Sequence, residues 1–196
     1  MNRPTCKVAF LDRDGTINVD EGYVHRIDEW RFLDGAVDAV VMLGNAGFRV
    51  AVITNQSGIA AGRYSMADVS QLHSYMLARM AEEGAIVDAI AVCPHGATDN
   101  CTCRKPQTAM ADRIARQLDA TIDYAHSWTI GDKLSDIQFG AALGMRTALI
   151  RSRYWTEADL DLPPTLVVSS LLDAAIAIVG ESQQPSDSSP RVPEDD

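Results

Sequence analysis

Short apolar runs that end abruptly in a polar residue recur along the chain. Three of them read KVAFLD at 7–12, RVAVITN at 49–55 and SWTIGD at 127–132. Continuous apolar runs of this length are typical of strands that are buried on both faces of a sheet. Similar runs predict three further strands, at 87–92, 147–150 and 166–168.

Segments with helix start and stop signals fill the intervals between these strands. Ser65 and Asp68 have the spacing of a capping box at the start of one long helix. Asp34 is placed to cap an earlier helix, and Pro106 suits the first turn of a later one. We therefore predict helices over 34–45, 65–84, 106–118, 134–143 and 171–179.

The alternation of strands and helices predicts an α/β fold with a parallel sheet. Strand–helix–strand units bury such a sheet under helices on both faces. We therefore expect one three-layer, Rossmann-like domain over residues 1–180. The remaining segment, 181–196, is rich in serine, proline and acidic residues and has almost nothing to bury. It is predicted to be a disordered acidic tail.

Composition narrows the class of protein. Of the 196 residues, 46% are hydrophobic and 22% are charged, which fits a globular protein with a single core. The sequence contains no apolar run near the roughly 20 residues that span a bilayer, and its start lacks the apolar region of a signal peptide. We expect a cytoplasmic monomer that does not bind membranes.

The net charge of −10 argues against a nucleic-acid partner, which would require a basic face. A small anionic substrate remains compatible with it. A few local cations or a bound metal ion can reverse the sign of the field inside one cleft.

Chemically active side chains follow the predicted strands. In open parallel sheets, ligands bind beyond the carboxyl ends of the strands, so these side chains are expected to meet at one edge. They are Asp12 and Asp14, Thr54 and Asn55, Cys93 and His95, and Asp132.

Four separate motifs at these strand ends favour a site for a metal ion and a phosphate group. FLDRDGTIN places two carboxylates, Asp12 and Asp14, where they suit Mg²⁺, although an Asp-rich turn would look similar. TNQSG adds a hydroxyl, an amide and backbone N–H groups that suit phosphate oxygens. CRKP supplies two cations, and GDKLSD supplies a further carboxylate, Asp132.

The motifs DRDGT, TNQSG, RKP and GDKLSD together resemble those of the haloacid-dehalogenase (HAD) superfamily of phosphotransferases, over about residues 7–150. The longer stretches FLDRDGTINVDEGYVHRIDEWRFLDG and TNQSGIAAGRY are most similar to D-glycero-D-manno-heptose 1,7-bisphosphate 7-phosphatases. The resemblance implies a Mg²⁺-dependent phosphatase that acts on a small phosphorylated sugar. It also implies a place in the synthesis of ADP-heptose for bacterial lipopolysaccharide.

The resemblance implies a role for each catalytic residue. Asp12 would be the nucleophile that forms a phosphoaspartyl intermediate. Asp14 would protonate the departing sugar oxygen and then deprotonate the attacking water. Thr54 and Lys105 would stabilise charge on the transferred phosphoryl group. Mg²⁺ would be held by Asp12, Asp132 and the backbone carbonyl of Asp14.

Substrate contacts are expected from the loops beside these groups. Asp136 is predicted to support Asp132 and Lys133 without binding the metal ion directly. The expected substrate-binding residues are Asp20, Glu21, Gly22, Tyr23, Asn55, Gln56, Ser57, Arg104 and Lys133.

The stretch CPHGATDNCTCRKP contains three cysteines and one histidine in the pattern C-x-H-x5-C-x-C. A closed set of four such ligands is typical of structural Zn²⁺, whereas catalytic zinc keeps an open position. We predict that zinc orders this loop and so holds Arg104 and Lys105 over the phosphate. The predicted zinc ligands are Cys93, His95, Cys101 and Cys103.

Other functions remain open at this point. The short spacing of the cysteine loop is similar to that of histidinol-phosphatases, whose substrate carries an amine; Glu21 is the nearby candidate acidic partner. From another class, the chain could be a phospho-acceptor signalling domain or a zinc-bearing interaction domain.

The intervals between motifs leave no room for the large cap domain of bigger HAD proteins.

Overall fold

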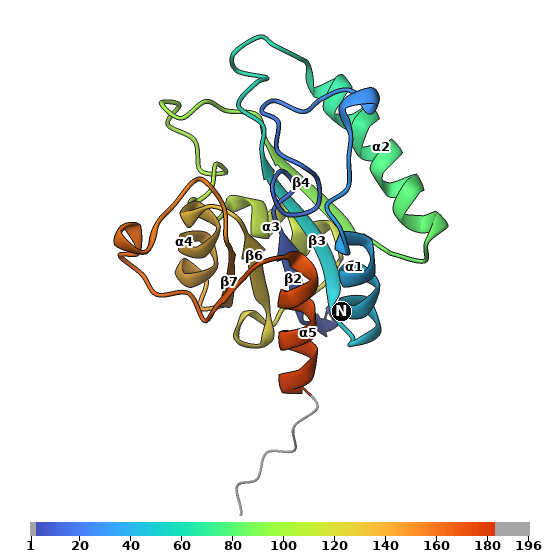
Figure 1. Ribbon diagram of the computed structural model, residues 1–196, viewed down its shortest axis with the longest axis vertical. Helices are drawn as coiled ribbons and strands as arrows, with labels where there is room; N and C mark the ends of the chain where they lie inside the picture. Colours follow the sequence, from blue (N-terminus) through green and yellow to red (C-terminus); the bar gives the residue numbers. More distant parts are fainter. Residues whose placement is uncertain (1–2, 183–196) are drawn as a thin grey trace, which may run out of the picture.

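A computed structural model describes residues 3–182 and arranges six parallel strands in one central sheet (Figure 1). The strand order is β4-β3-β2-β6-β7-β8, and two short strands, β1 and β5, pair separately in parallel. The strands are β1 Thr5–Cys6, β2 Val8–Leu11, β3 Arg49–Asn55, β4 Ala89–Cys93, β5 Thr121–Ile122, β6 Trp128–Gly131, β7 Arg146–Ile150 and β8 Leu166–Val168.

Helices connect the strands of the main sheet. The α-helices are α1 Ala36–Asn45, α2 Met66–Glu82, α3 Ala109–Gln117, α4 Leu134–Ala142 and α5 Leu171–Ser182. Short 3₁₀ turns lie at η1 Ile27–Glu29, η2 Tyr124–His126 and η3 Glu157–Asp159.

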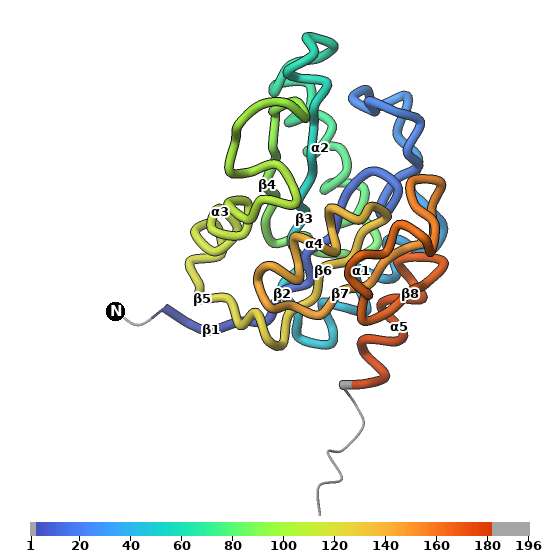
Figure 2. Tube along the Cα trace, turned by 90° about the vertical axis from the view of Figure 1, so that its left-hand side faces the viewer, coloured from blue at the N-terminus to red at the C-terminus, as the bar shows by residue number. Residues whose placement is uncertain are grey.

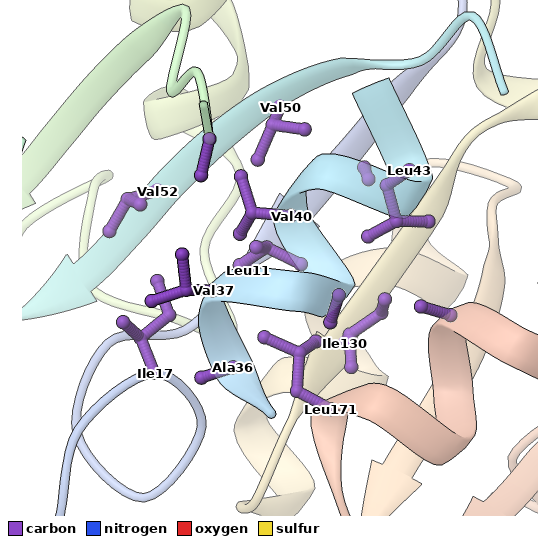
Figure 3. Close-up of a cluster of buried hydrophobic side chains, with 14 of the residues drawn as sticks. Leu11, Ile17, Ala36, Val37, Val40, Leu43, Val50, Val52, Ile130 and Leu171 are labelled. Atoms are coloured by element: carbon purple, nitrogen blue, oxygen red, sulfur yellow. The ribbon is translucent and has the colours of Figure 1, made fainter. Parts of the chain in front are cut away.

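Alternate residues of the central strands pack into different helical layers. Ala9 and Leu11 of β2 belong to a buried cluster that includes residues of α1, α2 and α5. Val8 and Phe10 belong to another, on the side of α3 and α4. Figure 3 shows the first cluster, in which side chains of α1 and α5 approach those of the sheet. The predicted three-layer Rossmann-like fold is confirmed.

Two of the predicted helix starts are wrong by a few residues. Gly35, with a left-handed backbone (φ 71°), precedes α1 where Asp34 was expected to cap it. Helix α3 begins at Ala109, so Pro106 is not in its first turn. The segment before α3 instead forms tight turns, in which the backbone N–H of Gln107 donates to Arg104 and that of Ala109 donates to Thr102. These turns close the cysteine loop, so helix α3 begins later in the chain than predicted.

Other boundaries agree more closely with the sequence. The capping box of Ser65 and Asp68 is present at the start of α2. Strand β4 begins two residues later than predicted, and α5 continues three residues further, to Ser182. The short strands β1 and β5 were not predicted. Apart from residues 181 and 182, which end α5, the predicted tail lies outside the described residues.

The carboxyl ends of the strands point to one side of the molecule. The loops that follow β2, β3 and β4 gather there, in the upper half of both views (Figures 1 and 2). Within residues 3–182 the segments between strands form loops and layer helices, and none builds a separate cap domain. In the same part of the chain, no helix has the length and apolar character needed to cross a membrane.

Candidate active site

The strand order changes direction at β2, whose neighbours are β3 on one side and β6 on the other. Asp12 and Asp132 follow β2 and β6 at this point. The backbone N–H of Asp12 donates to the carbonyl of Ile130 at 2.9 Å. Gly15 has φ 85°, and a Cβ there would overlap the Asp132 carboxylate. Glycine therefore allows the turn after β2 to pack directly on Asp132.

Lys105 lies between two buried carboxylates. Its Nζ is 2.7 Å from Oδ1 of Asp12 and 2.6 Å from Oδ1 of Asp136, and it also donates to the carbonyl of Ile53 at 2.8 Å. Burial alone would lower the pKa of Lys105, but Asp12 and Asp136 raise it above its usual value. The ammonium group therefore stays charged beside Asp12.

A second cation, Lys133, faces the same carboxylates from the half-buried start of α4. Its Nζ lies 3.3 Å from Oδ1 of Asp132, 3.9 Å from Oδ2 of Asp12 and 3.4 Å from the backbone carbonyl of Asp14. Burial lowers its pKa, but the surrounding carboxylates, Asp12 first, raise the pKa well above the usual lysine value. Asp12 is thus flanked by two ammonium groups.

Most of the predicted substrate-binding residues line one open cleft above these groups. The cleft has a volume of about 430 Å³, and Asp12, Asp14 and Lys105 also line it. Glu21 does not: its side chain is exposed outside the cleft. Thr54 is buried below the surface, where its hydroxyl accepts a hydrogen bond from Gln56. The predicted substrate contacts along the cleft are Asp20, Gly22, Tyr23, Asn55, Gln56, Ser57, Arg104 and Lys133.

The side chains of Asn55 and Gln56 are held by hydrogen bonds to groups of the catalytic set. The side chain of Asn55 accepts from the N–H of Lys105 at 3.0 Å and donates to its carbonyl at 3.2 Å. Gln56 donates to the Asp14 carboxylate at 2.9 Å and accepts from the Tyr64 hydroxyl at 2.7 Å. Asn55 thus fixes the backbone that carries Lys105, and Gln56 orients Asp14.

The loop after β7 supplies residues that the sequence reasoning missed. Tyr154 lines the cleft, and its hydroxyl donates to Oδ2 of Asp20 at 2.8 Å. Arg153 donates to the Asp20 carbonyl at 3.1 Å, and Nζ of Lys133 lies 4.7 Å from the Tyr154 ring. This loop follows the strand predicted at 147–150. Because ligands bind beyond the carboxyl ends of parallel strands, the position of that strand was a signal for these residues.

Three buried carboxylates form a donor set that suits Mg²⁺. Oxygen atoms of Asp12, Asp132 and Asp136 lie within 4.8 Å of one another. Burial, with Asp12 and Asp136 as neighbours, raises the pKa of Asp132 to about 7 despite Lys133. A hard divalent cation prefers such oxygen ligands and relieves their mutual repulsion. Asp136 is also tied to Lys105 and accepts from the N–H of Lys133, so it is the least available of the three.

We expect the affinity for Mg²⁺ to fall about tenfold per pH unit below 7, because the ion must then displace a proton from Asp132. The same raised pKa means that the metal-free fold loses stability as pH rises from the usual carboxyl range through about 7. Mg²⁺ should restore that stability at pH 8. Calorimetric titration and melting curves at pH 6, 7 and 8 measure both effects. A pH-independent affinity would contradict the assignment, and Asp28→Asn, an exposed carboxylate, is the control.

The four predicted zinc ligands also meet in space. Sγ of Cys93 lies 3.3 Å from Sγ of Cys103 and 3.9 Å from Sγ of Cys101, and Nδ1 of His95 lies 3.3 Å from Sγ of Cys103. A tetrahedral ion with Zn–S bonds of about 2.3 Å sets its ligands about 3.8 Å apart. Burial raises the pKa of Cys93 to about 12, so its thiolate needs a nearby cation. The cluster therefore fits a structural zinc ion.

The cluster is joined directly to the cations of the cleft. The N–H of Arg104 donates to Sγ of Cys101 at 3.4 Å, and its guanidinium donates to the His95 carbonyl at 3.2 Å. Lys105 is the next residue, and its backbone N–H donates to the side chain of Asn55. The loop thus holds Arg104 and Lys105 at the edge of the cleft.

Cys101→Ser should lower the zinc content from about one ion per chain to near zero. The melting temperature should fall by roughly 6–12 °C, which corresponds to about 3 kcal/mol, because the metal-bound loop contributes folding energy. Elemental analysis and calorimetry measure the two quantities. Cys6→Ser, a cysteine outside the cluster, should change neither. A Cys101→Ser protein with full zinc and stability but no activity would show that the cluster is not a structural clamp.

Comparison with known proteins gives a consistent picture. The HAD-hydrolase-like family model matches residues 102–174. A protein of Photorhabdus laumondii named D-glycero-beta-D-manno-heptose-1,7-bisphosphate 7-phosphatase is 40% identical over 180 residues, which cover 88% of this chain and 95% of the relative. A protein of the same name from Escherichia coli K12 is 40% identical over 177 residues, covering 86% and 92%.

A solved structure has a closely similar fold over most of the chain. The crystal structure of D,D-heptose 1,7-bisphosphate phosphatase from B. bronchiseptica, complexed with magnesium and phosphate, superposes with a TM-score of 0.81 at 38% identity. The match covers 89% of this chain and 99% of that one.

Proposed function

This chain belongs to the heptose-1,7-bisphosphate 7-phosphatase family of HAD-like hydrolases, and we propose that it removes the 7-phosphate of D-glycero-β-D-manno-heptose 1,7-bisphosphate. The observation that carries the proposal is the setting of Asp12. Its carboxylate lies in the cleft with Lys105 at 2.7 Å and Lys133 at 3.9 Å. Fixed cations beside a carboxylate are what a dianionic phosphate ester needs before that carboxylate can attack it.

In the first half-reaction, a carboxylate oxygen of Asp12 bonds to phosphorus as the bond from phosphorus to the sugar oxygen breaks. Asp14 gives its proton to that departing oxygen. Lys105 and Lys133 stabilise the charge on the transferred phosphoryl group, and Thr54 lies below it as a further candidate donor. Heptose 1-phosphate leaves, and Asp12 carries the phosphoryl group.

In the second half-reaction, Asp14 takes a proton from a water molecule, whose oxygen attacks the phosphorus of the phosphoaspartate. Inorganic phosphate leaves and Asp12 is regenerated. Mg²⁺, when bound by Asp12, Asp132 and the Asp14 carbonyl, would neutralise charge on the phosphoryl oxygens. Zinc, at the cysteine loop, would take no part in the chemistry.

The cations around the cleft support a substrate with two phosphates. Arg104 lies on the cleft wall beside Lys105, and its planar guanidinium suits the second phosphate or the sugar hydroxyls. Histidinol phosphate would instead need an acidic group for its amine. Glu21, the candidate for that role, lies outside the cleft, and Asp20 is already bonded to Tyr154 and Lys133.

The product supports a place in a longer synthesis. Removal of the 7-phosphate leaves a heptose 1-phosphate, whose anomeric phosphate is suited to nucleotide activation. We therefore propose that the protein acts in ADP-heptose synthesis for lipopolysaccharide. We also propose that it does so as a cytoplasmic monomer.

The test is phosphate release, with Mg²⁺, from the β and α anomers of heptose 1,7-bisphosphate and from histidinol phosphate. We expect the β anomer to give the highest kcat/KM. A preference for histidinol phosphate would mean that the cysteine loop, and not the loop after β2, determines the substrate. A stable phosphoprotein without phosphate release would favour a signalling domain.

A further inference from the structure

Arg13 is a fully buried cation that the proposed chemistry does not use. Its side chain has no exposed surface, although it stands between Asp12 and Asp14 in the sequence. Its guanidinium donates to Asp14 twice, from Nη2 to Oδ1 at 2.9 Å and from Nε to Oδ2 at 3.2 Å. Nη2 also donates to the carbonyl of Val24 at 2.7 Å. The fork of Arg13 therefore sets the plane of the Asp14 carboxylate.

The remaining arm of Arg13 ends on His73 of helix α2. Nη1 of Arg13 lies 3.2 Å from Nε2 of His73, sixty residues further along the chain. Burial, together with the charge of Arg13, lowers the pKa of His73 to about 3. A guanidinium can only donate, so Nε2 of the neutral imidazole accepts this hydrogen bond from Arg13.

Core packing does not require a histidine at this position. The other buried residues of α2 are all apolar: Val69, Leu72, Met76 and Met80. A buried polar group costs free energy unless it is hydrogen-bonded. The His73 imidazole is hydrogen-bonded to Arg13, which in turn donates to the carboxylate of Asp14. The contact with Arg13 therefore links the imidazole to the carboxylate of Asp14.

We propose that His73 is a positioning residue for the acid–base group of the reaction: it fixes Arg13, and Arg13 fixes the carboxylate of Asp14 at the cleft. The proposal rests on the proposed phosphatase function. On the far side, Asn18 and Gln56 donate to the same carboxylate at 3.0 and 2.9 Å. His73 is not among the residues that line the cleft, so its substitution removes none of the groups that face the substrate.

The two half-reactions depend on Asp14 to different extents. With a sugar leaving group, Asp14 must supply a proton as the bond to phosphorus breaks. A nitrophenolate leaving group departs without a proton, so the first half-reaction then proceeds without Asp14. Hydrolysis of the phosphoaspartate needs Asp14 to take a proton from water in both cases. A displaced Asp14 therefore slows sugar release and phosphoaspartate hydrolysis but not the first release of nitrophenolate. General damage to the fold would slow all three.

The experiment compares His73→Phe, which removes the acceptor, with His73→Gln, whose carbonyl restores an acceptor near the position of Nε2. Met80→Ala, buried two turns further along α2, is the control for structural damage. His73→Asn, whose carbonyl is too short to reach Arg13, replaces His73→Phe if that variant does not fold. Each protein is assayed with heptose 1,7-bisphosphate at steady state and with p-nitrophenyl phosphate by stopped flow.

We expect His73→Phe to lower kcat for the heptose bisphosphate about 100-fold, with KM nearly unchanged, because displacing a catalytic group by about 1 Å can cost that much in rate. With p-nitrophenyl phosphate it should release about one nitrophenolate per active site at the wild-type rate and then turn over slowly. His73→Gln should recover kcat to within about threefold of wild type. Met80→Ala should have a lower melting temperature than the wild-type protein but the same kinetics with both substrates.

Equal losses of the nitrophenolate burst and of sugar turnover in His73→Phe would overturn the proposal, as would wild-type kinetics. So would a folded His73→Gln that behaves like His73→Phe. Failure of the wild-type protein to release phosphate from any substrate would instead refute the proposed function, and the positioning role with it.

Discussion

Replacing Asp12 with Asn is expected to lower phosphate release by about 10⁴-fold or more while the protein stays folded. The carboxamide is not a nucleophile, so no phosphoaspartate can form. Its carbonyl oxygen can still accept the hydrogen bond that Lys105 donates to Oδ1 at 2.7 Å. The change also removes one of three clustered negative charges, so the melting temperature should not fall.

Two measurements check this outcome. Phosphate release is followed with saturating Mg²⁺, and labelled substrate is quenched with acid to trap any phosphoprotein. Asp28→Asn, which alters an exposed carboxylate paired with Arg26, should leave both unchanged. Activity of Asp12→Asn within tenfold of wild type, or a labelled Asp12→Asn protein, would remove Asp12 as the nucleophile.

Replacing Lys105 with Met should have the largest effect on stability, about 3–5 kcal/mol, and should also abolish turnover. Lys105 is buried, and its Nζ is the partner of Asp12 at 2.7 Å and of Asp136 at 2.6 Å. Methionine has a similar length but no charge. Without the ammonium group, two carboxylates stay buried beside each other, and the attacking group faces the phosphate dianion with one cation fewer.

A double variant separates the two consequences. Asp136→Asn removes the carboxylate that takes no part in either proposed half-reaction, so Lys105→Met/Asp136→Asn should regain much of the lost stability but not the activity. Chemical denaturation with and without Mg²⁺ measures the first, and phosphate release measures the second. If Lys105→Met alone unfolds like wild type, Lys105 does not compensate the buried carboxylates. If the double variant turns over normally, Lys105 has no role in catalysis.

The elements were predicted well where the signal is local. The apolar runs of β2, β3 and β6 and the capping box of α2 are each read from a few consecutive residues. The start of α3 was missed because it depends on turns that close the cysteine loop around Thr102 and Arg104. Strands β1 and β5 are too short to show a periodicity, and they form by pairing across 116 residues of chain, as in Thr5 with Thr121.

The candidate site shows the same division. Asp12, Asp132 and Lys105 could be placed together from the sequence because parallel strands end at one edge. The sequence could not place Asn55 and Gln56, which are bonded to Lys105 and Asp14, or Glu21, which is exposed and does not line the cleft. A loop residue's direction is set by neighbours that the local sequence does not reveal.

The sequence by itself determined the α/β class, the edge at which the chemistry gathers, and the residue types that meet there, because strand patterning and motif spacing are local. Only the tertiary structure decided which partner each of these residues has. Lys105 meets Asp12 across 93 residues, Arg13 meets His73 across 60, and Tyr154 meets Asp20 across 134. Such contacts exist only after the helices and loops have packed on the sheet, because the packing fixes which buried charge lies within reach of which donor.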